Sequence, residues 1–399
     1  MSSGANPFAL VNGRVILPDR VLAGHALVIQ GATIQDLPPQ EALPPEMPRV
    51  DVGGRLISPG LIDIHTHGAL GHTFNEPTPQ AFAAITQENL RRGVTGLLAT
   101  TATAPIQDLA ACLAMAREWI AGVHPQAREG AQVLGVHVEG PYFSPAQAGA
   151  QDPAHLRTPD DGSVEQLLAF HDVIRILTFA PELPGALALT RRLLELGIVP
   201  GAGHSNATEE EALPAIDAGL RHMIHIWSGQ STTVREGPWR KPGLLELSLT
   251  DERLTVEMIA DNRHLPRTLM RLAVQCIGPE RLCLVSDATS GAGLPEGARF
   301  RMGEMEYQVH DGVGMMLDRS AFAGSTTLLS QMIPVMTQVV GVPLHQAVGM
   351  ASLNPARVIG LEERKGSLEP GKDADVVVFE ENFEAWKVWV RGREVMSHE

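Results

Sequence analysis

The chain has 399 residues, a formal net charge of -15 at pH 7 and 44% hydrophobic residues, values typical of a globular protein with a large core. The acidic charge argues against nucleic acid as a partner, because binding a phosphate backbone requires clustered Lys and Arg. No apolar run reaches the roughly 18 residues that span a bilayer, so we expect no membrane contact and a cytoplasmic location.

The three cysteines, Cys112, Cys276 and Cys283, are widely spaced and lie in apolar stretches. This spacing fits neither a disulfide framework nor a Cys-x-x-Cys metal site. We therefore expect three buried thiols in a protein of a reducing compartment.

Short β segments occupy residues 8–50 at the start of the chain. They are too few to hold a core alone, so they require a partner from elsewhere in the chain. Residues 366–395 return to an alternating β pattern and can supply that partner. We expect one small β-sandwich built from residues 1–57 and 356–399, beside a catalytic barrel formed by residues 58–355.

From residue 61 onward, short apolar strands alternate with amphipathic helical stretches. The expected strands are 61–65, 95–100, 133–139, 174–179, 198–203, 223–226, 254–259 and 282–287. The expected helices are 78–92, 106–120, 164–171, 186–197, 208–219 and 266–276. This alternation predicts an α/β fold with a parallel (β/α)8 barrel of the TIM type, and a doubly wound sheet is the alternative. A β-like insertion is expected at 298–316, followed by helical segments at 326–340 and 344–351.

Six side chains that can bind a metal fall at the carboxyl ends of five of these strands, the edge where barrel active sites form. The first two lie two positions apart, so their imidazoles point to the same side of the strand. The six residues are His65, His67, Glu139, His204, His225 and Asp287.

Each of these residues also has an ordinary structural interpretation. Glu139 ends an apolar strand and would be a costly unpaired charge unless a cation lies beside it. His204 and Asp287 could instead cap the helices that follow them. His222 competes with His225 as a ligand, but it lies at the start of its strand and is expected to make a local hydrogen bond.

Neutral imidazoles with a carboxylate suit Zn²⁺ or Fe²⁺, bound as one or two ions. Such a metal lowers the pKa of a water molecule toward neutrality and polarises a substrate carbonyl. A carboxylate in line with that water, Asp287, can take its proton and deliver it to a leaving nitrogen. The pattern therefore predicts hydrolysis of an amide or a related C–N bond.

Six motifs surround these residues: PGLIDIHTHG, HVEGPYFS, GHSNAT, SDATSGAG, FAGSTTLL and ASLNPARVIGLEERKGSLEPGKDADVVVF. Together they resemble the amidohydrolase superfamily and, within it, the N-acetylglucosamine-6-phosphate deacetylases, over residues 10–395. The resemblance implies a (β/α)8 barrel with a β-sandwich from both termini. It also implies Glu139, His204 and His225 as the main metal ligands. Asp287 would then be the acid and base, and the two first-strand histidines would hold a second metal.

The chain departs from the family pattern at two places. Where the family has Gly-Ala-His, with the His beside the substrate carbonyl, this chain has Gln151, which can donate a hydrogen bond but carries no charge. Where the family has His-Leu-Phe-Asn-Ala-Met, this chain has HIWSGQS. The phosphosugar contacts of the Asn-Ala pair are therefore expected from Ser228, Gly229 and Gln230.

Two further residues match positions where the family binds phosphate. They are His264 and Arg235, the arginine reaching from the neighbouring subunit of a homodimer. The structural interpretation of Arg235 and of Arg240 is a solvated loop. Retained phosphate contacts predict an anionic substrate, whereas the two departures predict an altered acyl or sugar pocket.

We therefore predict a metal-dependent amidohydrolase that removes an acyl group, most simply acetyl, from an amino-sugar phosphate. The expected reaction converts N-acetylglucosamine 6-phosphate to glucosamine 6-phosphate and acetate. The rival is hydrolysis of another N-acyl substrate: an unphosphorylated amino sugar, an N-acyl amino acid or a cyclic amide. No candidate for a carboxylated Lys lies at a strand tip, which argues against the cyclic amide. A silent, metal-stabilised binding protein is the alternative from another class.

Overall fold

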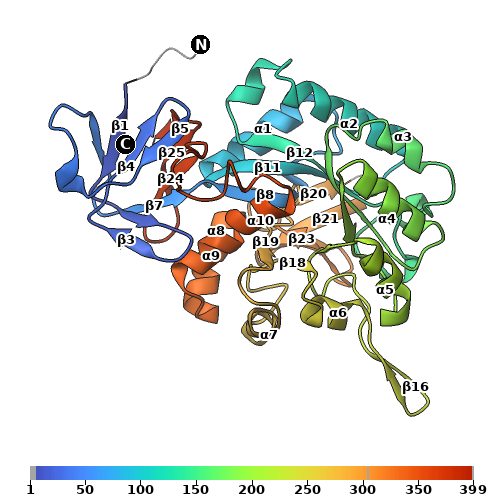
Figure 1. The fold of residues 1–399 in the computed structure, drawn as a ribbon. Helices are drawn as coiled ribbons and strands as arrows, with labels where there is room; N and C mark the ends of the chain where they lie inside the picture. The colour runs from blue at the N-terminus through green and yellow to red at the C-terminus, as the bar shows by residue number, and fades with distance from the viewer. Residues whose placement is uncertain (1–5, 303–304, 398–399) are drawn as a thin grey trace.

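The computed structural model describes residues 6–302 and 305–397. Eight parallel strands form one sheet in the order in which they occur along the chain (Figure 1). They are β8 (Leu61–Thr66), β11 (Val94–Thr101), β12 (Gln132–Glu139), β13 (Ile174–Phe179), β14 (Val199–Ala202), β15 (His222–Met223), β18 (Thr255–Met258) and β19 (Leu282–Leu284). A parallel bridge between Thr66 and Ala288 joins the first strand to the end of the last. The predicted (β/α)8 barrel is confirmed, because a doubly wound sheet would have a reordered, open set of strands.

Four barrel strands are shorter than expected, and three of them stop shortly before a residue with a left-handed backbone. β14, β15 and β19 are followed by His204, His225 and Asp287, whose φ angles are 47°, 21° and 44°. A positive φ turns the backbone out of the extended conformation, so the strand ladder cannot continue through these residues. Three of the six predicted site residues thus lie where the backbone leaves the strand conformation.

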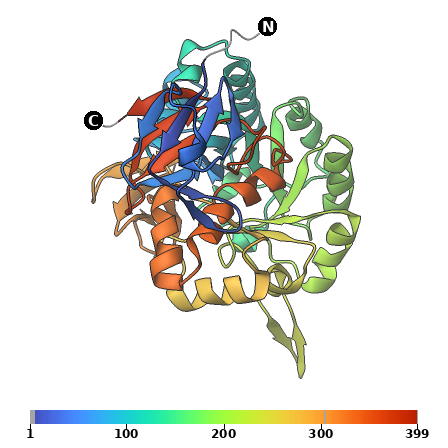
Figure 2. The ribbon, with the colours of Figure 1, turned by 60° about the vertical axis from the view of Figure 1, so that its left-hand side comes forward.

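Ten α-helices of the described residues surround the barrel or follow it (Figures 1 and 2). They are α1 (Pro79–Arg91), α2 (Ile106–Ile120), α3 (Val164–Leu168), α4 (Ala186–Glu195), α5 (Glu209–Ala218), α6 (Leu244–Thr250), α7 (Arg267–Ile277), α8 (Leu329–Pro334), α9 (Leu344–Met350) and α10 (Leu353–Val358). α2 shows why they form: Ile106, Leu109 and Leu113 are buried at helical spacing against the strands. Helix α6 was not expected from the sequence, because its seven residues are too few for a clear period.

An antiparallel sheet of four strands follows the barrel at its mouth. Its strands are β20 (Arg299–Met302), β21 (Met305–His310), β22 (Val313–Met316) and β23 (Phe322–Ser325). The predicted β insertion is therefore present and one strand longer than expected. The last strand lies against the end of the barrel, because Ser325 bridges to Ala288.

Both ends of the chain contribute to one six-stranded sheet, in which β24 pairs with β7 (Figure 2). The sheet contains β2 (Arg14–Ile16), β3 (Val21–Ala23), β7 (Leu56–Pro59), β24 (Val376–Phe379), β25 (Ala385–Val390) and β26 (Arg393–Ser397). A four-stranded sheet adds β1 (Phe8–Val11), β4 (Leu27–Gln30), β5 (Thr33–Asp36) and β6 (Arg49–Asp51). Side chains of both sheets, among them Leu10 and Trp389, share a buried core. The boundaries expected for the two domains stay a prediction.

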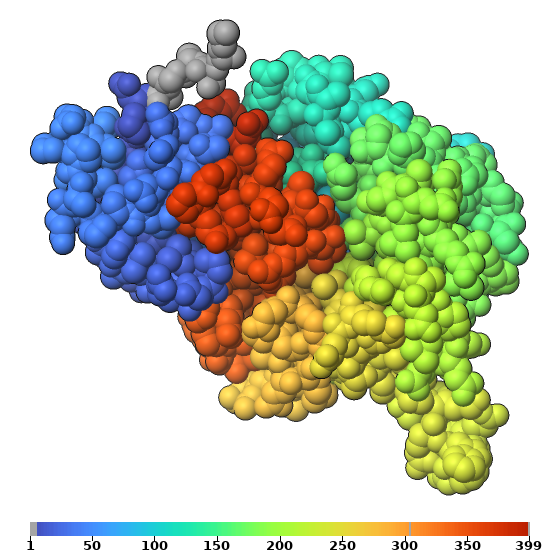
Figure 3. Space-filling view, in the orientation of Figure 1, coloured from blue at the N-terminus to red at the C-terminus, as the bar shows by residue number. Residues whose placement is uncertain are grey.

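A hairpin projects from the opposite side of the barrel (Figures 1 and 3). It consists of β16 (Val234–Glu236) and β17 (Trp239–Lys241), and the side chain of Trp239 is 74% exposed. Among the residues that the structure describes, this Trp is the large hydrophobic side chain that a projecting hairpin leaves most exposed.

Cys112 and Cys283 are buried, but Cys276 is exposed. The expectation of three buried thiols is wrong at Cys276, which lies on the amphipathic helix α7 and faces away from the buried side formed by Met270, Ala273 and Ile277. Within residues 6–302 and 305–397, every helix is too short or too polar to cross a membrane.

A buried ion pair ties the start of β12 to the segment that leads back to the sandwich. The ammonium of Lys365 lies 3.2 Å from an Asp373 carboxylate oxygen and donates hydrogen bonds to Asp375 and, at 3.1 Å, to the Gln132 side chain. The side chains of Lys365 and Asp375 are 6% and 7% exposed. Removing one partner would therefore leave an uncompensated buried charge.

Replacing this lysine tests that dependence. Lys365→Ala is expected to lower the free energy of unfolding by about 3–5 kcal/mol, because the buried carboxylate of Asp375 loses its cation and that of Asp373 keeps only the exposed Arg364. Arg364→Ala is the control: Arg364 also pairs with Asp373, but its side chain is 60% exposed, so the loss should stay below about 1 kcal/mol. Urea unfolding followed by circular dichroism measures both, and equal losses would contradict the expectation.

Candidate active site

The buried carboxylate of Glu139, at the end of β12, is the centre of the site. Its Oε1 lies 3.0 Å from His225 Nε2, 3.3 Å from His204 Nε2 and 3.5 Å from His65 Nε2. Its Oε2 lies 3.4 Å from His67 Nε2. The predicted histidines and Glu139 therefore lie within one cluster, although they come from four strands.

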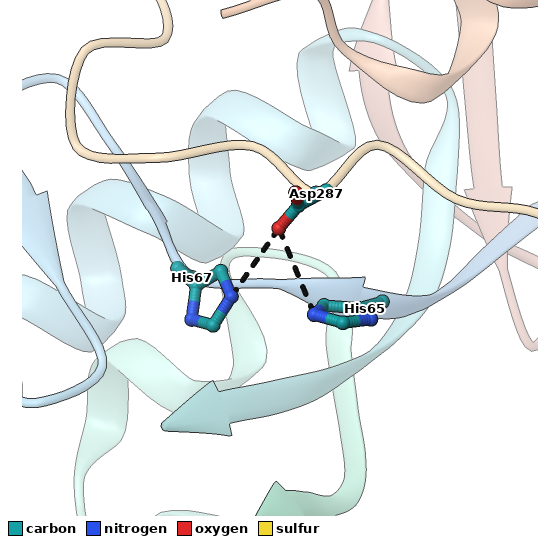
Figure 4. Close-up of side chains that lie close together, drawn as sticks. All are labelled: His65, His67 and Asp287. Carbon is teal, nitrogen blue, oxygen red and sulfur yellow. Dashed lines mark ion pairs between the residues drawn. The ribbon is translucent and has the colours of Figure 1, made fainter. Parts of the chain in front are cut away.

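Asp287 completes this cluster from the end of the last barrel strand. Its Oδ1 lies 3.3 Å from His67 Nε2 and 3.6 Å from His65 Nε2 (Figure 4). The two imidazoles converge on this carboxylate, as their spacing on β8 predicts. Closure of the barrel brings residues 65 and 287 together, since the backbone N–H of Asp287 donates to the carbonyl of His65 at 2.9 Å.

Three imidazoles of the cluster use the same ring nitrogen to hold their orientation. His65 Nδ1 lies 2.7 Å from a Glu257 carboxylate oxygen. His204 Nδ1 lies 2.8 Å from the Gln147 carbonyl oxygen, and His225 Nδ1 lies 3.1 Å from the Ser228 carbonyl oxygen. Carboxylate and carbonyl oxygens can only accept, so Nδ1 carries the proton in each case. In the neutral ring, Nε2 then has no proton and carries a lone pair. The lone pairs of all three rings face Glu139.

Glu257 on β18 is an essential part of this arrangement that sequence reasoning missed. Besides His65, its carboxylate accepts from His222 Nε2 at 2.9 Å, and its side chain is fully buried. His222, expected to make a local hydrogen bond, also lies 2.9 Å from the Thr255 hydroxyl. The signal was present: a glutamate inside the apolar strand TVEM is the same costly buried charge that pointed to Glu139.

His137 is a further buried histidine near the cluster, and it forms a close group with His65 and Glu257. Both of its ring nitrogens have partners, the Ile64 carbonyl at 3.1 Å and the Thr178 hydroxyl at 2.7 Å. Burial lowers the pKa of His137 to about 3, so its ring is neutral. We assign it to the core and not to the cluster.

The electrostatics of the site require positive charge. Burial alone would raise the pKa of Glu139, and in the absence of a metal it is held well below its usual value only if the imidazoles of His204, His225 and His65 carry a second proton, on Nε2. Burial opposes ionisation of Asp287 in the same way, and the hydrogen bond from His67 outweighs it, so the pKa of Asp287 is also lowered. Both carboxylates are therefore ionised in a buried environment.

These residues fit a divalent metal. Lone pairs of three imidazoles directed at one carboxylate repel it unless a cation lies between them, and His65 Nε2 is a buried nitrogen without a hydrogen-bond partner. Imidazole nitrogens held through their other N–H, with carboxylate oxygens, are the usual ligands of transition metals. Two close groups of possible ligands overlap here: His65, His67 and Asp287, and His65, Glu139 and His225.

The cluster forms the floor of a cavity of about 230 Å³ at the mouth of the barrel. The predicted residues Gln151, Ser228, Gly229 and His264 all line it, together with β23 from the inserted sheet. No Lys or Arg is among its lining residues. Within the described part of this chain, the cavity lining thus contains imidazoles but no permanently charged cationic side chain.

Two predicted substrate contacts lie elsewhere. The Gln230 side chain is turned into its own loop, where it donates to the Ile224 carbonyl at 3.1 Å and accepts from the Trp227 N–H at 3.3 Å. Because both ends of the amide are used, Gln230 supports the loop and does not line the cavity. Arg235 lies on the exposed β16 strand, where its Nε donates to the Gly237 carbonyl at 2.8 Å. It does not line the cavity of its own chain.

Gln151 occupies the cavity wall next to Glu139. Its amide nitrogen donates to Glu139 Oε2, and its amide oxygen accepts from the Thr103 N–H at 2.7 Å. One N–H of the amide therefore remains for a ligand, and the other braces the central carboxylate.

A closed parallel barrel with this set of side chains at its strand ends defines a metal-dependent hydrolase of the amidohydrolase class. The profile of the Amidohydrolase family matches residues 56–395, and that of the NagA composite domain matches residues 8–57. The chain belongs to the amidohydrolase family and, within it, to the N-acetylglucosamine-6-phosphate deacetylases.

Several relatives match along nearly the whole chain. An N-acetylgalactosamine-6-phosphate deacetylase of Escherichia coli O157:H7 is 34% identical, over 95% of this chain and 97% of the relative. An N-acetylglucosamine-6-phosphate deacetylase of Vibrio furnissii is 34% identical, over 86% and 83%. A mutant of the Mycobacterium smegmatis N-acetyl-D-glucosamine-6-phosphate deacetylase, in complex with N-acetyl-D-glucosamine-6-phosphate, superposes with a TM-score of 0.89 at 31% identity, over 98% and 100%.

The hydrogen bonds of Glu257 generate a prediction about metal retention. Glu257→Gln replaces one of two acceptor oxygens by a donor, so the Nδ1 proton of His65 and the Nε2 proton of His222 can no longer both be accepted. The affinity for bound metal is expected to fall by about 10–100-fold, as for other groups that orient ligands. Elemental analysis after graded dialysis against a chelator measures it. Glu252→Gln, at an exposed position, is the control, and equal metal loss in the two variants would contradict the expectation.

Proposed function

We propose that this enzyme hydrolyses the N-acetyl group of N-acetylglucosamine 6-phosphate, giving glucosamine 6-phosphate and acetate. The observation that carries the proposal is the convergence of Asp287 with four histidines and Glu139 on one cavity. This arrangement supplies ligands for a metal and a separate carboxylate for proton transfer. The names of the relatives, which are deacetylases of amino-sugar 6-phosphates, support the substrate class.

We assign the main metal site to Glu139, His204 and His225, and a second site to His65 and His67. The distances from His65 Nε2 to Glu139 and to Asp287, 3.5 and 3.6 Å, support placing the residues that would hold the two ions in one cluster. Zn²⁺ and Fe²⁺ both suit this donor set. When bound, the metal polarises the amide carbonyl and lowers the pKa of water in the cavity.

Asp287 carries the proton through the reaction. Its ionised carboxylate accepts one proton from the water whose oxygen forms the new bond to the carbonyl carbon. It then gives that proton to the amide nitrogen, so the C–N bond breaks with a neutral amine as the leaving group. The left-handed backbone at Asp287 directs the carboxylate toward His67 and into the cavity.

Gln151 positions the site instead of carrying charge. Its hydrogen bond to Glu139 holds the carboxylate in the orientation that faces the histidines. The remaining N–H of the amide is free to donate to the substrate carbonyl. The substitution of His by Gln thus places more of the carbonyl polarisation on the metal.

The phosphate of the substrate needs cationic partners beyond those of one chain. His264 lines the cavity, but no Lys or Arg does. We assign the missing charge to Arg235 of a second subunit, carried into the cavity by the projecting hairpin, so the working form is a homodimer. Ser228 and Gly229 then contact the sugar phosphate from the same subunit as His264.

The C4 epimer, N-acetylgalactosamine 6-phosphate, is the second candidate. It is supported by the Escherichia coli relative, which bears that name at 34% identity. The two sugars present the same amide and the same phosphate, so the metal cluster and Asp287 do not discriminate between them. The three cysteines, none of them in a disulfide, support a cytoplasmic location for either activity.

Asp287→Asn tests the proposed proton transfer. An amide of the same shape cannot accept the proton, so kcat is expected to fall by about 10²–10⁴-fold. Bound metal, measured by elemental analysis, and the circular dichroism spectrum confirm that the site remains intact. Full activity of this variant on the best substrate found would refute the role of Asp287.

Arg235→Ala tests the source of the missing cation. The kcat and KM of the wild type and the variant are measured on a panel of possible substrates. The panel contains N-acetylglucosamine and N-acetylgalactosamine, each with and without the 6-phosphate, and an N-acetyl amino acid. We expect the KM of the phosphorylated sugars to rise about tenfold or more, since a charge-assisted contact contributes about 1.5–3 kcal/mol, with no change for the others. Arg240→Ala, on the same hairpin, is the control. A monomer in light scattering, or preference for the amino acid, would count against the proposal.

A further inference from the structure

The imidazole of His264, on the loop after β18, is held by a buried carboxylate outside the metal cluster. Its Nδ1 donates to Asp261 Oδ2 at 2.7 Å, and the two side chains are 6% and 0% exposed. The other oxygen, Oδ1, accepts the backbone N–H groups of Arg263 and His264 at 2.9 Å each. Asp261 therefore fixes the ring so that Nε2 is the nitrogen left for the cavity.

The same oxygen of Asp261 has a second partner, Ser325 at the end of β23. The Ser325 hydroxyl donates to Asp261 Oδ2 at 2.8 Å, and this side chain is fully buried. Earlier on the same strand, Phe322 packs edge-on against the imidazole of His264, with ring centroids 5.0 Å apart. Strand β23 thus contacts the imidazole both directly and through one shared oxygen atom.

Ser325 also holds the backbone of Asp287. Its N–H donates to the Asp287 carbonyl at 2.8 Å, and its own carbonyl accepts from the Thr289 N–H at 3.0 Å. Asp287 has a φ of 44°, an unfavourable conformation that neighbouring contacts must maintain. Gly324 permits the close approach, because a Cβ there would lie 2.5 Å from the Asp287 carbonyl oxygen. The orientation of Asp287 therefore depends on the position of Ser325.

We infer that Asp261 and Ser325 are positioning residues that couple anion binding at His264 to the catalytic orientation of Asp287. The inference rests on the proposed function, in which His264 receives the phosphate of the substrate. Each link is a buried hydrogen bond of 2.7–2.8 Å. Asp261 and Ser325 are buried, so a shift of one hydrogen-bonded group is expected to displace the next. A phosphate on His264 would thus raise kcat and not only lower KM.

The test compares kcat and KM on N-acetylglucosamine 6-phosphate with those on N-acetylglucosamine. For the wild-type enzyme, we expect kcat to be about tenfold or more higher on the phosphorylated sugar, the size of a typical coupling between sites. Ser325→Ala removes only the hydroxyl link. It should bring the ratio of the two kcat values close to one by lowering kcat on the phosphorylated sugar. The KM for that sugar and the kcat on the plain sugar should stay within about twofold.

Ser320→Ala is the matched control, because Ser320 is an exposed serine of the same inserted segment whose hydroxyl contacts only its own turn. It should keep the wild-type ratio. If Ser325→Ala does not fold by circular dichroism, Ser325→Cys carries the same expectation, since a thiol keeps the volume but is a weak donor. Asp261→Asn should also bring the ratio of the two kcat values close to one. In addition, it should raise the KM for the phosphorylated sugar, because the Nδ1 proton of His264 loses its acceptor.

Three results would overturn the inference. One is an equal wild-type kcat on both sugars, and another is a Ser325→Ala variant that loses kcat by the same factor on both, which would make Ser325 a structural support only. The third is a wild-type enzyme with no turnover of any phosphorylated amino sugar. That last result alone would also overturn the proposed function.

Discussion

Three imidazoles direct unprotonated nitrogens at the buried carboxylate of Glu139, and this arrangement is stable only with positive charge between them. The protein maintains it by giving each Nδ1 proton an acceptor: the carboxylate of Glu257 for His65, and backbone carbonyls for His204 and His225. The cost of burying these carboxylates is offset by the same imidazoles and by a bound cation. The left-handed strand ends and the closure of the barrel at the last strand all serve to bring these groups together.

The cavity above the cluster has, among the described residues, no permanently charged cationic side chain for a phosphate ligand. The described lining contains two carboxylates and several imidazoles but no Lys or Arg. The hairpin that carries Arg235 projects from the molecule (Figure 3), and its Trp239 is exposed. The proposed homodimer would reconcile the two observations, because Arg235 of a second subunit would supply the missing charge. Asp261 and Ser325 connect the imidazole of His264, proposed to receive the substrate phosphate, to the strand end that carries Asp287.

The fold was largely readable from the sequence because its elements obey simple periods. Strand β13 and helix α2 were predicted with the boundaries observed, since each is a continuous apolar or amphipathic run. The predicted strand boundaries are wrong at strands whose ends lead into site residues with a positive φ. The strands expected at 223–226 and 282–287 end at Met223 and Leu284, and the positive φ of His225 and Asp287 prevents an extended strand from running through those positions. Helix α6 was missed because it is short, and its stability comes from packing against its neighbours.

The sequence by itself determined the barrel and the six strand-end residues of the site, because the period of parallel strands places their carboxyl ends at one edge. Tertiary structure alone decided which groups orient those residues. Glu257 lies 192 positions from His65, and Ser325 lies 64 from Asp261, so no local spacing connects them. The structure likewise turned Gln230 into its loop and set Arg235 on a projecting hairpin. Partners of this kind are chosen by burial and hydrogen bonding across the fold, which a linear pattern does not encode.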